Sequence, residues 1–82
     1  MPYIKQERRD TYRVFEGTQF QGPGDLNYVF TKVLNAYVEQ YGLKYQVIND
    51  VVGALEGAKL EFYRRVAAPY EDGKIKENGD VY

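Results

Sequence analysis

The chain has 82 residues, a formal net charge of −1 and no Cys or His. Its length indicates one small domain, and its near-neutral charge argues against duplex nucleic acid, because phosphate contacts require an excess of Lys and Arg. The absence of Cys and His excludes disulfides, thiolate or imidazole metal sites, and Cys–His or Ser–His catalysis. We therefore expect no catalytic residue, no metal and no cofactor.

Membrane insertion is not expected either. No stretch of 18 apolar residues occurs, and the opening MPYIKQERRD does not have the pattern of a signal peptide. These features predict a cytoplasmic protein with no membrane partner.

Breaker residues divide the chain into three parts. An N-terminal arm is expected over residues 1–24 and ends in Gly22-Pro23-Gly24. A helical hairpin is expected over residues 25–68, followed by a C-terminal docking tail over residues 69–82.

The first helix is expected to begin at Asp25, a residue type that caps helix N-termini. Its apolar residues recur at helical spacing, at Leu26, Val29, Phe30, Val33 and Tyr37. Gly42 is expected to end this helix with a left-handed conformation.

The second helix is expected from about Tyr45 to Ala68. Pro69 is predicted to end it, because the residue before a proline is pushed out of the α region. The short link after Gly42 predicts an antiparallel hairpin. The expected core face consists of Ile48, Val51, Val52, Leu55, Ala58, Phe62 and Val66.

Surface left uncovered by this hairpin predicts self-assembly. The second helix exceeds the first by about 10 Å, and a two-helix hairpin without a disulfide or metal rarely folds alone. The fold class is therefore all-α, assembled as a homo-oligomer, although the arm could instead cover the overhang. Two helical glycines also suggest close backbone approach, unless the helix simply tolerates them. The expected interface residues are Gly53, Gly57, Leu60, Phe62, Val66 and Tyr82.

Arginine and tyrosine side chains suggest a site for an anionic ligand. Arginine recognises phosphate with a planar fork, and tyrosine can stack on a base. The arm and the second helix both carry such residues, and a returning arm would bring them together. The expected ligand-binding residues are Arg8, Arg9, Tyr12, Lys59, Tyr63, Arg64, Arg65 and Tyr70.

A structural role for the same side chains stays open. Arg65 is spaced to pair with Glu61, and Arg8 and Arg9 could pair with acidic residues of the tail, Glu71 and Asp72. Lys59 lies in the apolar stripe, from whose edge a lysine can extend into solvent.

The tail YEDGKIKENGDVY is acidic but does not match a metal loop. It lacks the D-x-D-x-D-G spacing of a calcium site. We expect a strap that docks on a neighbouring subunit, with Tyr82 as its anchor.

The chain is similar to a known group of proteins in several segments, which are MPYI, GDLNYV, INDVVGALE, KLEFYRRV and APYED…ENGDVY. It resembles a family of short proteins of unknown function from bacteriophages and prophages. The resemblance covers nearly the whole chain, but residues 11–21 depart from the family pattern. It implies a phage setting, hence the cytoplasm of an infected or lysogenic bacterium, and no catalytic residue.

These observations lead to three functional hypotheses. The first is a phage-encoded binding protein that sequesters a nucleotide-type ligand, such as a host immune signal, between subunits. The second is a protein–protein adaptor or inhibitor. The third, an enzyme that uses the carboxylates of the tail and a metal, has the least support.

Overall fold

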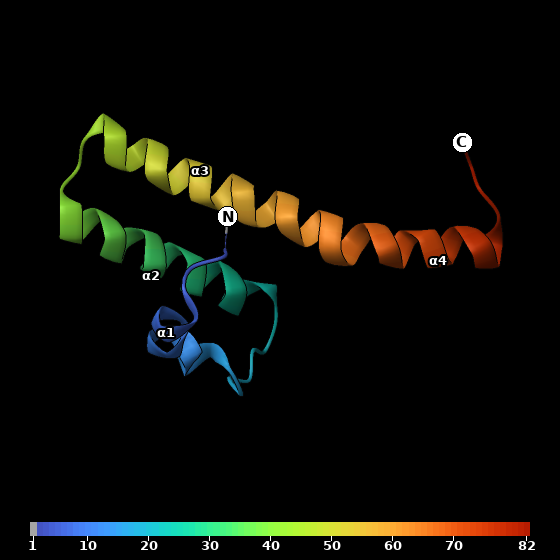
Figure 1. The fold of residues 1–82 in the computed structure, drawn as a ribbon, viewed down its shortest axis with the longest axis horizontal. Coiled ribbons are helices and arrows are strands. Elements are labelled where there is room, and N and C mark those ends of the chain that lie inside the picture. Colours follow the sequence, from blue (N-terminus) through green and yellow to red (C-terminus); the bar gives the residue numbers. More distant parts are fainter. Residues whose placement is uncertain (1) are drawn as a thin grey trace.

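The computed structural model describes residues 2–82, and its regular elements are helical (Figure 1). No strand occurs among residues 2–82, so the prediction of an all-α fold is confirmed. The elements are α1 (Gln6–Arg9), the 3₁₀ helix η1 (Asp10–Phe15), α2 (Pro23–Tyr41), α3 (Tyr45–Phe62), the π-helical turn η2 (Tyr63–Ala67) and α4 (Ala68–Asn78).

Helix α2 begins at Pro23, so the prediction that Asp25 caps this helix is wrong. Proline suits the first helical position, because its ring fixes φ near the helical value and its missing N–H would have no partner there. Asp25 lies two residues further along, in the first turn of the helix. Its Oδ2 accepts a hydrogen bond from the backbone N–H of Gln21 at 2.9 Å, so Asp25 holds the incoming loop against the helix.

The link between α2 and α3 has the boundaries that the sequence predicts. Gly42 has a φ of 88°, and its N–H donates to the Val38 carbonyl oxygen at 2.7 Å. Helix α3 then begins at Tyr45. Both predicted boundaries are confirmed. Figure 1 shows α2 and α3 side by side and running in opposite directions.

The helix that begins at Tyr45 continues past Pro69, so the prediction that Pro69 ends it is wrong. Elements α3, η2 and α4 form one continuous helix of 34 residues from Tyr45 to Asn78, here called the long helix. The N–H of Ala68 bonds to the Tyr63 carbonyl, five residues earlier. This wider turn relieves the clash between a proline ring and the carbonyl four residues before it.

Much of the segment predicted as a docking tail is therefore helical. Only residues 79–82 follow the long helix without regular structure. At 1.5 Å per residue the long helix measures about 50 Å, which accounts for the 50 Å longest dimension of the molecule. Helix α2 lies beside α3, so the half formed by η2 and α4 extends past it (Figure 1).

The core is small. Val47 is the one fully buried hydrophobic residue among residues 2–82, with 2% of its surface exposed. The expected core face is only partly right: Val51 is half-buried, whereas Ile48, Val52, Leu55, Phe62 and Val66 are exposed. Helix α2 covers the side of α3 that carries Val47, about 100° round from Ile48.

The accessible surface reflects this small core. It measures 7655 Å², whereas a folded monomer of 9.5 kDa exposes about 5,000 Å². The isolated chain thus leaves an excess of about 2,600 Å² in contact with solvent, when the same scaling is applied.

The N-terminal arm, described from Pro2 onward, contains α1 and η1, which the sequence did not predict. In Figure 1 they lie below α2, on the side away from α3. Neither packs on the long helix within the described residues. The arm does not cover the overhang, because Phe62 and Val66 stay 63% and 51% exposed.

Candidate functional site

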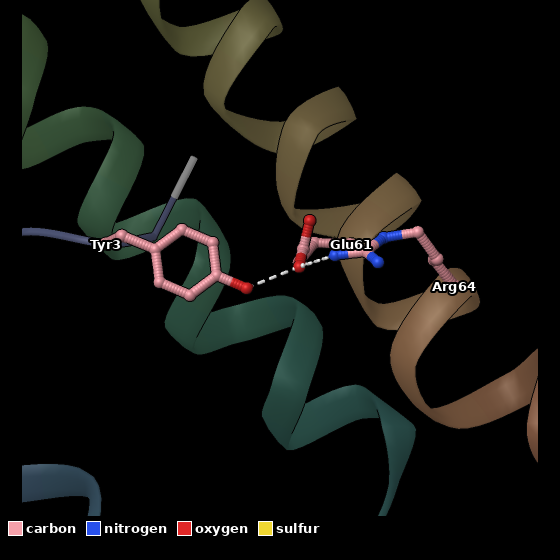
Figure 2. Close-up of polar contacts among 3 residues, drawn as sticks. All are labelled: Tyr3, Glu61 and Arg64. Atoms are coloured by element: carbon pink, nitrogen blue, oxygen red, sulfur yellow. Dashed lines mark hydrogen bonds and ion pairs between the residues drawn. The ribbon is translucent and has the colours of Figure 1, made fainter.

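A three-residue contact joins the start of the arm to the long helix (Figure 2). One oxygen of Glu61, Oε1, accepts a hydrogen bond from the Tyr3 hydroxyl at 2.5 Å and another from Arg64 Nη2 at 2.8 Å. The hydrogen bond from Tyr3, followed by that from Arg64, holds the pKa of Glu61 below its ordinary value. The same bond raises the pKa of Tyr3. This contact fastens the arm to the long helix.

The ion pair at Glu61 involves a different arginine from the one considered in the sequence. Arg64 lies three residues after Glu61 and pairs with it, whereas Arg65 makes no ion pair within residues 2–82. Arg65 is still close enough for its charge to contribute to the lowered pKa of Glu61. Three- and four-residue spacings both bring side chains together on a helix.

Other expected ligand-binding residues of the long helix also have partners within the chain. Lys59 Nζ lies 3.6 Å from Glu56 Oε1, so Lys59 points into solvent rather than into a pocket. The Tyr63 hydroxyl donates to Glu71 Oε1 at 2.7 Å, which raises the pKa of Tyr63. The ammonium of Lys74 lies 5.5 Å from the centre of the Tyr70 ring. We call Lys59, Tyr63, Arg64, Arg65 and Tyr70 the helix cluster.

The remaining three expected residues, Arg8, Arg9 and Tyr12, form the arm cluster. The guanidinium of Arg8 lies over the Tyr12 ring, 5.9 Å from its centre, and its Nη2 donates to the Tyr12 hydroxyl at 3.4 Å. Arg9 Nε donates to the Ile4 carbonyl oxygen at 3.0 Å. Within residues 2–82, neither arginine makes an ion pair.

The two clusters do not meet in a single chain. Neither α1 nor η1 packs on η2 or α4 in the described part of the chain. The expected pairing of Arg8 and Arg9 with Glu71 and Asp72 is therefore wrong. The arm does return to the long helix, but it brings Tyr3 there instead of its arginines.

One aspartate of α3, which contacts α2, is not among the site residues expected from the sequence. Asp50 is half-buried, and its two oxygens accept hydrogen bonds from the Tyr37 hydroxyl and from Gln46 Nε2, both at 2.9 Å. The bond to Asp50 raises the pKa of Tyr37. Asp50 lies three residues after Val47 and thus on its face of the helix, which is the signal that would have indicated it.

An apolar groove opens between the arm, α2 and α3. It has a volume of about 370 Å³ and is lined by apolar side chains alone. The lining residues are Phe15, Phe20, Leu26, Val29, Phe30, Val33, Leu34 and Leu55. We refer to it as the apolar groove.

The expected interface residues lie mostly at the surface of the chain. A Cβ added at Gly53 would meet no atom within 4 Å, and Gly57 is half-buried. The four large members, Leu60, Phe62, Val66 and Tyr82, are all exposed. Their role in assembly stays a prediction.

Residues 2–82 lack both a metal-binding group and a helix that could span a membrane. No group of three carboxylate, His or Cys side chains suited to a metal ion occurs in residues 2–82. Within the same residues, no helix is both long and apolar enough to cross a bilayer.

Comparisons with known proteins place the chain in a family without a known activity. No curated protein and no solved structure matches it. A family model described as a domain of unknown function (DUF6899) matches residues 1–81. The expected relationship to a family of unknown function is thus confirmed, and the chain belongs to the DUF6899 family.

Proposed function

We propose that this protein acts by binding rather than by catalysis, as a homo-oligomer that holds a small anionic, nucleotide-type ligand between its subunits. The observation that carries the proposal is the arm cluster. Its arginines are not neutralised by an ion pair within residues 2–82, and Tyr12 beside them is exposed.

The arm cluster has the chemistry that a nucleotide requires. A guanidinium offers paired donors to phosphate oxygens, and an exposed tyrosine ring offers a face for a base. Arg8 already lies over the ring of Tyr12, so the two groups present a cation and an aromatic face at one place. An α1 of only four residues forms a surface patch rather than an enclosed pocket, which is why a neighbouring subunit is needed to complete the site.

The helix cluster supports this proposal less strongly. Lys59 and Arg64 are already paired with Glu56 and Glu61, and a ligand would have to displace those carboxylates. Arg65 is the member of the helix cluster that we propose as the contribution of a neighbouring subunit.

Native mass spectrometry of the purified protein tests whether a ligand is carried. Isothermal titration with a panel of linear and cyclic adenine and guanine nucleotides then gives affinities. Arg8→Ala is expected to weaken binding about tenfold or more, the effect of losing one charged contact.

Arg13→Ala is the matched control. Arg13 belongs to the same short helical segment but is already paired with Asp10 at 3.0 Å, so its loss should leave nucleotide affinity unchanged. Equal losses of nucleotide affinity in Arg8→Ala and Arg13→Ala would indicate a general effect of charge or folding. No binding of any nucleotide by the unaltered protein would refute the proposal.

A finer version of the proposal concerns the biological setting. If the chain is encoded by a phage, the ligand is a nucleotide immune signal of the host and the protein sequesters it. Release of intact ligand after denaturation supports sequestration, whereas a chemically changed ligand points to an enzyme.

A second candidate function, a protein–protein adaptor or inhibitor, is favoured by the apolar groove. An exposed apolar surface of this kind is typical of protein-binding sites. Phe20→Asp places a charge in the groove and should abolish capture of a protein partner without changing nucleotide affinity.

A further inference from the structure

The long helix carries a stripe of exposed side chains with the spacing of a coiled coil. From Ile48 to Val66 the intervals alternate between four and three residues, which is a heptad pattern. We call Ile48, Val52, Leu55, Lys59, Phe62, Val66 and Tyr70 the outer stripe. Its apolar members are 40% to 67% exposed, so α2 leaves each of them partly open to a partner, Leu55 at the border of the apolar groove.

The π-helical turn extends this stripe past Pro69. Tyr70 follows Phe62 by eight residues, one more than a heptad. A π-helical turn inserts one residue into an α-helix, so the eight residues here span the two turns of a normal heptad. The hydrogen bond from Tyr63 to Glu71, also eight residues apart, fits this alignment of the two side chains on one face.

The size of the exposed surface indicates a large protein partner. A stable complex buries about 800 Å² on each subunit, and the chain exposes an excess of about 2,600 Å² over a folded monomer of its mass when judged by surface scaling. A heptad stripe is complementary to another stripe of the same kind. A second copy of this chain supplies such a stripe over the same length.

Lys59 decides the orientation of the two copies. It lies at the centre of the outer stripe and is its one charged member. In a parallel pair, Lys59 would face Lys59 of the partner subunit, and like charges repel. In an antiparallel pair, Lys59 faces Phe62, Leu55 faces Val66, and Val52 faces Tyr70 of the other copy.

The antiparallel arrangement also covers the overhang. Helix α2 flanks only the first half of the long helix (Figure 1). An antiparallel partner aligns its own first half with η2 and α4 of the first copy, and the reverse. Each Lys59 then meets an aromatic ring, which attracts a cation.

We propose that the protein forms an antiparallel two-fold dimer through the outer stripes of two long helices, with Lys59 of each copy against Phe62 of the other. This inference deepens the self-assembly on which the proposed function rests. It is tested without added nucleotide, so a failure of nucleotide binding leaves it standing, and a failure of the dimer does not by itself remove the arm cluster.

Disulfide trapping tests the orientation, because the chain has no native cysteine. Leu55→Cys and Val66→Cys variants are prepared separately, unfolded, mixed, refolded together and oxidised. An antiparallel pair gives a covalent dimer only in the mixture, since each new cysteine faces the other position. A covalent dimer of the Leu55→Cys variant alone would indicate a parallel pair and overturn the proposal.

A second pair of variants guards against misfolding of the first. Val52→Cys mixed with Tyr70→Cys should also cross-link, and circular dichroism reports whether each variant is helical. Absence of a cross-link in both mixtures, with helicity retained, would refute the dimer.

Sedimentation equilibrium tests which face of the long helix is used. Val66→Asn should raise the dimer dissociation constant at least about tenfold, as loss of a central contact residue does. Leu60→Asn is the control, because Leu60 is 58% exposed but lies off the outer stripe, on the face with Gly53 and Gly57. If Leu60→Asn dissociates the dimer and Val66→Asn does not, the glycine face is the interface and the proposal is wrong.

Discussion

The two halves of the long helix differ in their surroundings and in their apolar content, which is higher in the first half. The first half, α3, lies against α2 and contains Val47, the buried residue of the described chain. The second half, η2 and α4, carries Val66, Tyr70 and Ile75, which are all exposed. Both halves are continuous helix.

This difference separates local helix-forming tendency from tertiary stabilisation. Most of the stability of a helix in a protein comes from the packing of one face rather than from propensity. The first half has such packing within the chain. In the proposed dimer the second half obtains such packing from the other copy, so its stability should depend on protein concentration.

Hydrogen exchange should give the largest contrast between the halves. In dilute protein, amides of α3 near Val47 are expected to exchange only on global unfolding, and those of α4 by local fraying. For a domain stable by about 5 kcal/mol, protection would differ by a factor on the order of 1,000. Exchange measured by NMR at two protein concentrations checks this. Equal protection of both halves in dilute solution would contradict the contrast.

Replacing a buried and an exposed valine by alanine should show which side chains of α3 contribute to stability by packing within the chain. Val47→Ala is expected to lower the free energy of unfolding by about 2 kcal/mol, because a fully buried side chain is truncated. Val52→Ala is the control and should cost less than about 0.5 kcal/mol in dilute protein, as exposed positions do. Urea denaturation measures both. A large cost at Val52 that persists on dilution would show that Val52 is packed within the chain.

Replacing a helical glycine in each half sharpens the same comparison. Neither Gly53 nor Gly73 would bring a new Cβ within 4 Å of another atom, so alanine should add about 1 kcal/mol of helix stability at either site. At Gly53 this gain should raise the midpoint of global unfolding. At Gly73 it should raise helicity with little effect on that midpoint. Loss of assembly in Gly53→Ala would instead identify a close contact between copies at this glycine.

Removal of the Tyr3 hydroxyl should have the smallest effect. Tyr3→Phe breaks the bond to Glu61, and we expect a slight fall in melting temperature and faster exchange in the arm. Tyr12→Phe is a control in the same arm that leaves the long helix untouched. Unchanged hydrogen exchange in the arm of the Tyr3→Phe variant would show that this contact does not fasten the arm.

The pH dependence of the same contact follows from its two pKa shifts. Glu61 has a lowered pKa, so its contribution is complete above the ordinary pKa of a glutamate and is lost as pH falls through the lowered value. Tyr3 has a raised pKa, so its contribution is complete below the ordinary pKa of a tyrosine and is lost as pH rises through the raised value. Backbone chemical shifts of the arm over a pH titration should show its release at both extremes, and Tyr3→Phe, which lacks the bond to Glu61, should show neither transition.

Local sequence signals predicted some boundaries correctly and failed where two signals competed. Gly42 and Tyr45 stand at the predicted end and start of helices, because the link Gly42-Leu43-Lys44 contains no proline that competes with the glycine signal. Asp25 is a good N-cap in isolation, but Pro23 two residues earlier fixes a helical φ first. Pro69 was expected to end the helix, and the π-helical turn before it accommodates the ring instead.

Which residues are buried was harder to predict than where the helices lie. Periodicity showed that α3 has apolar residues on several faces, but not which face α2 would cover. The covered face carries Val47, whereas Ile48, Val52 and Leu55 lie to one side of it and are 40% to 60% exposed. The residues expected to bind a ligand form one group in the sequence analysis, and the fold separates them because the arm docks through Tyr3.

The contact between Tyr3 and Glu61 joins residues 58 positions apart, and this separation has a consequence for the order of folding. Closing a long loop costs more entropy than closing the three-residue link between α2 and α3. The two helices should therefore associate first and the arm should dock last. By the same reasoning the arm detaches before the helices separate, so a protease should cut the native protein first between residues 19 and 22, which lie in the link between η1 and α2, outside both helices.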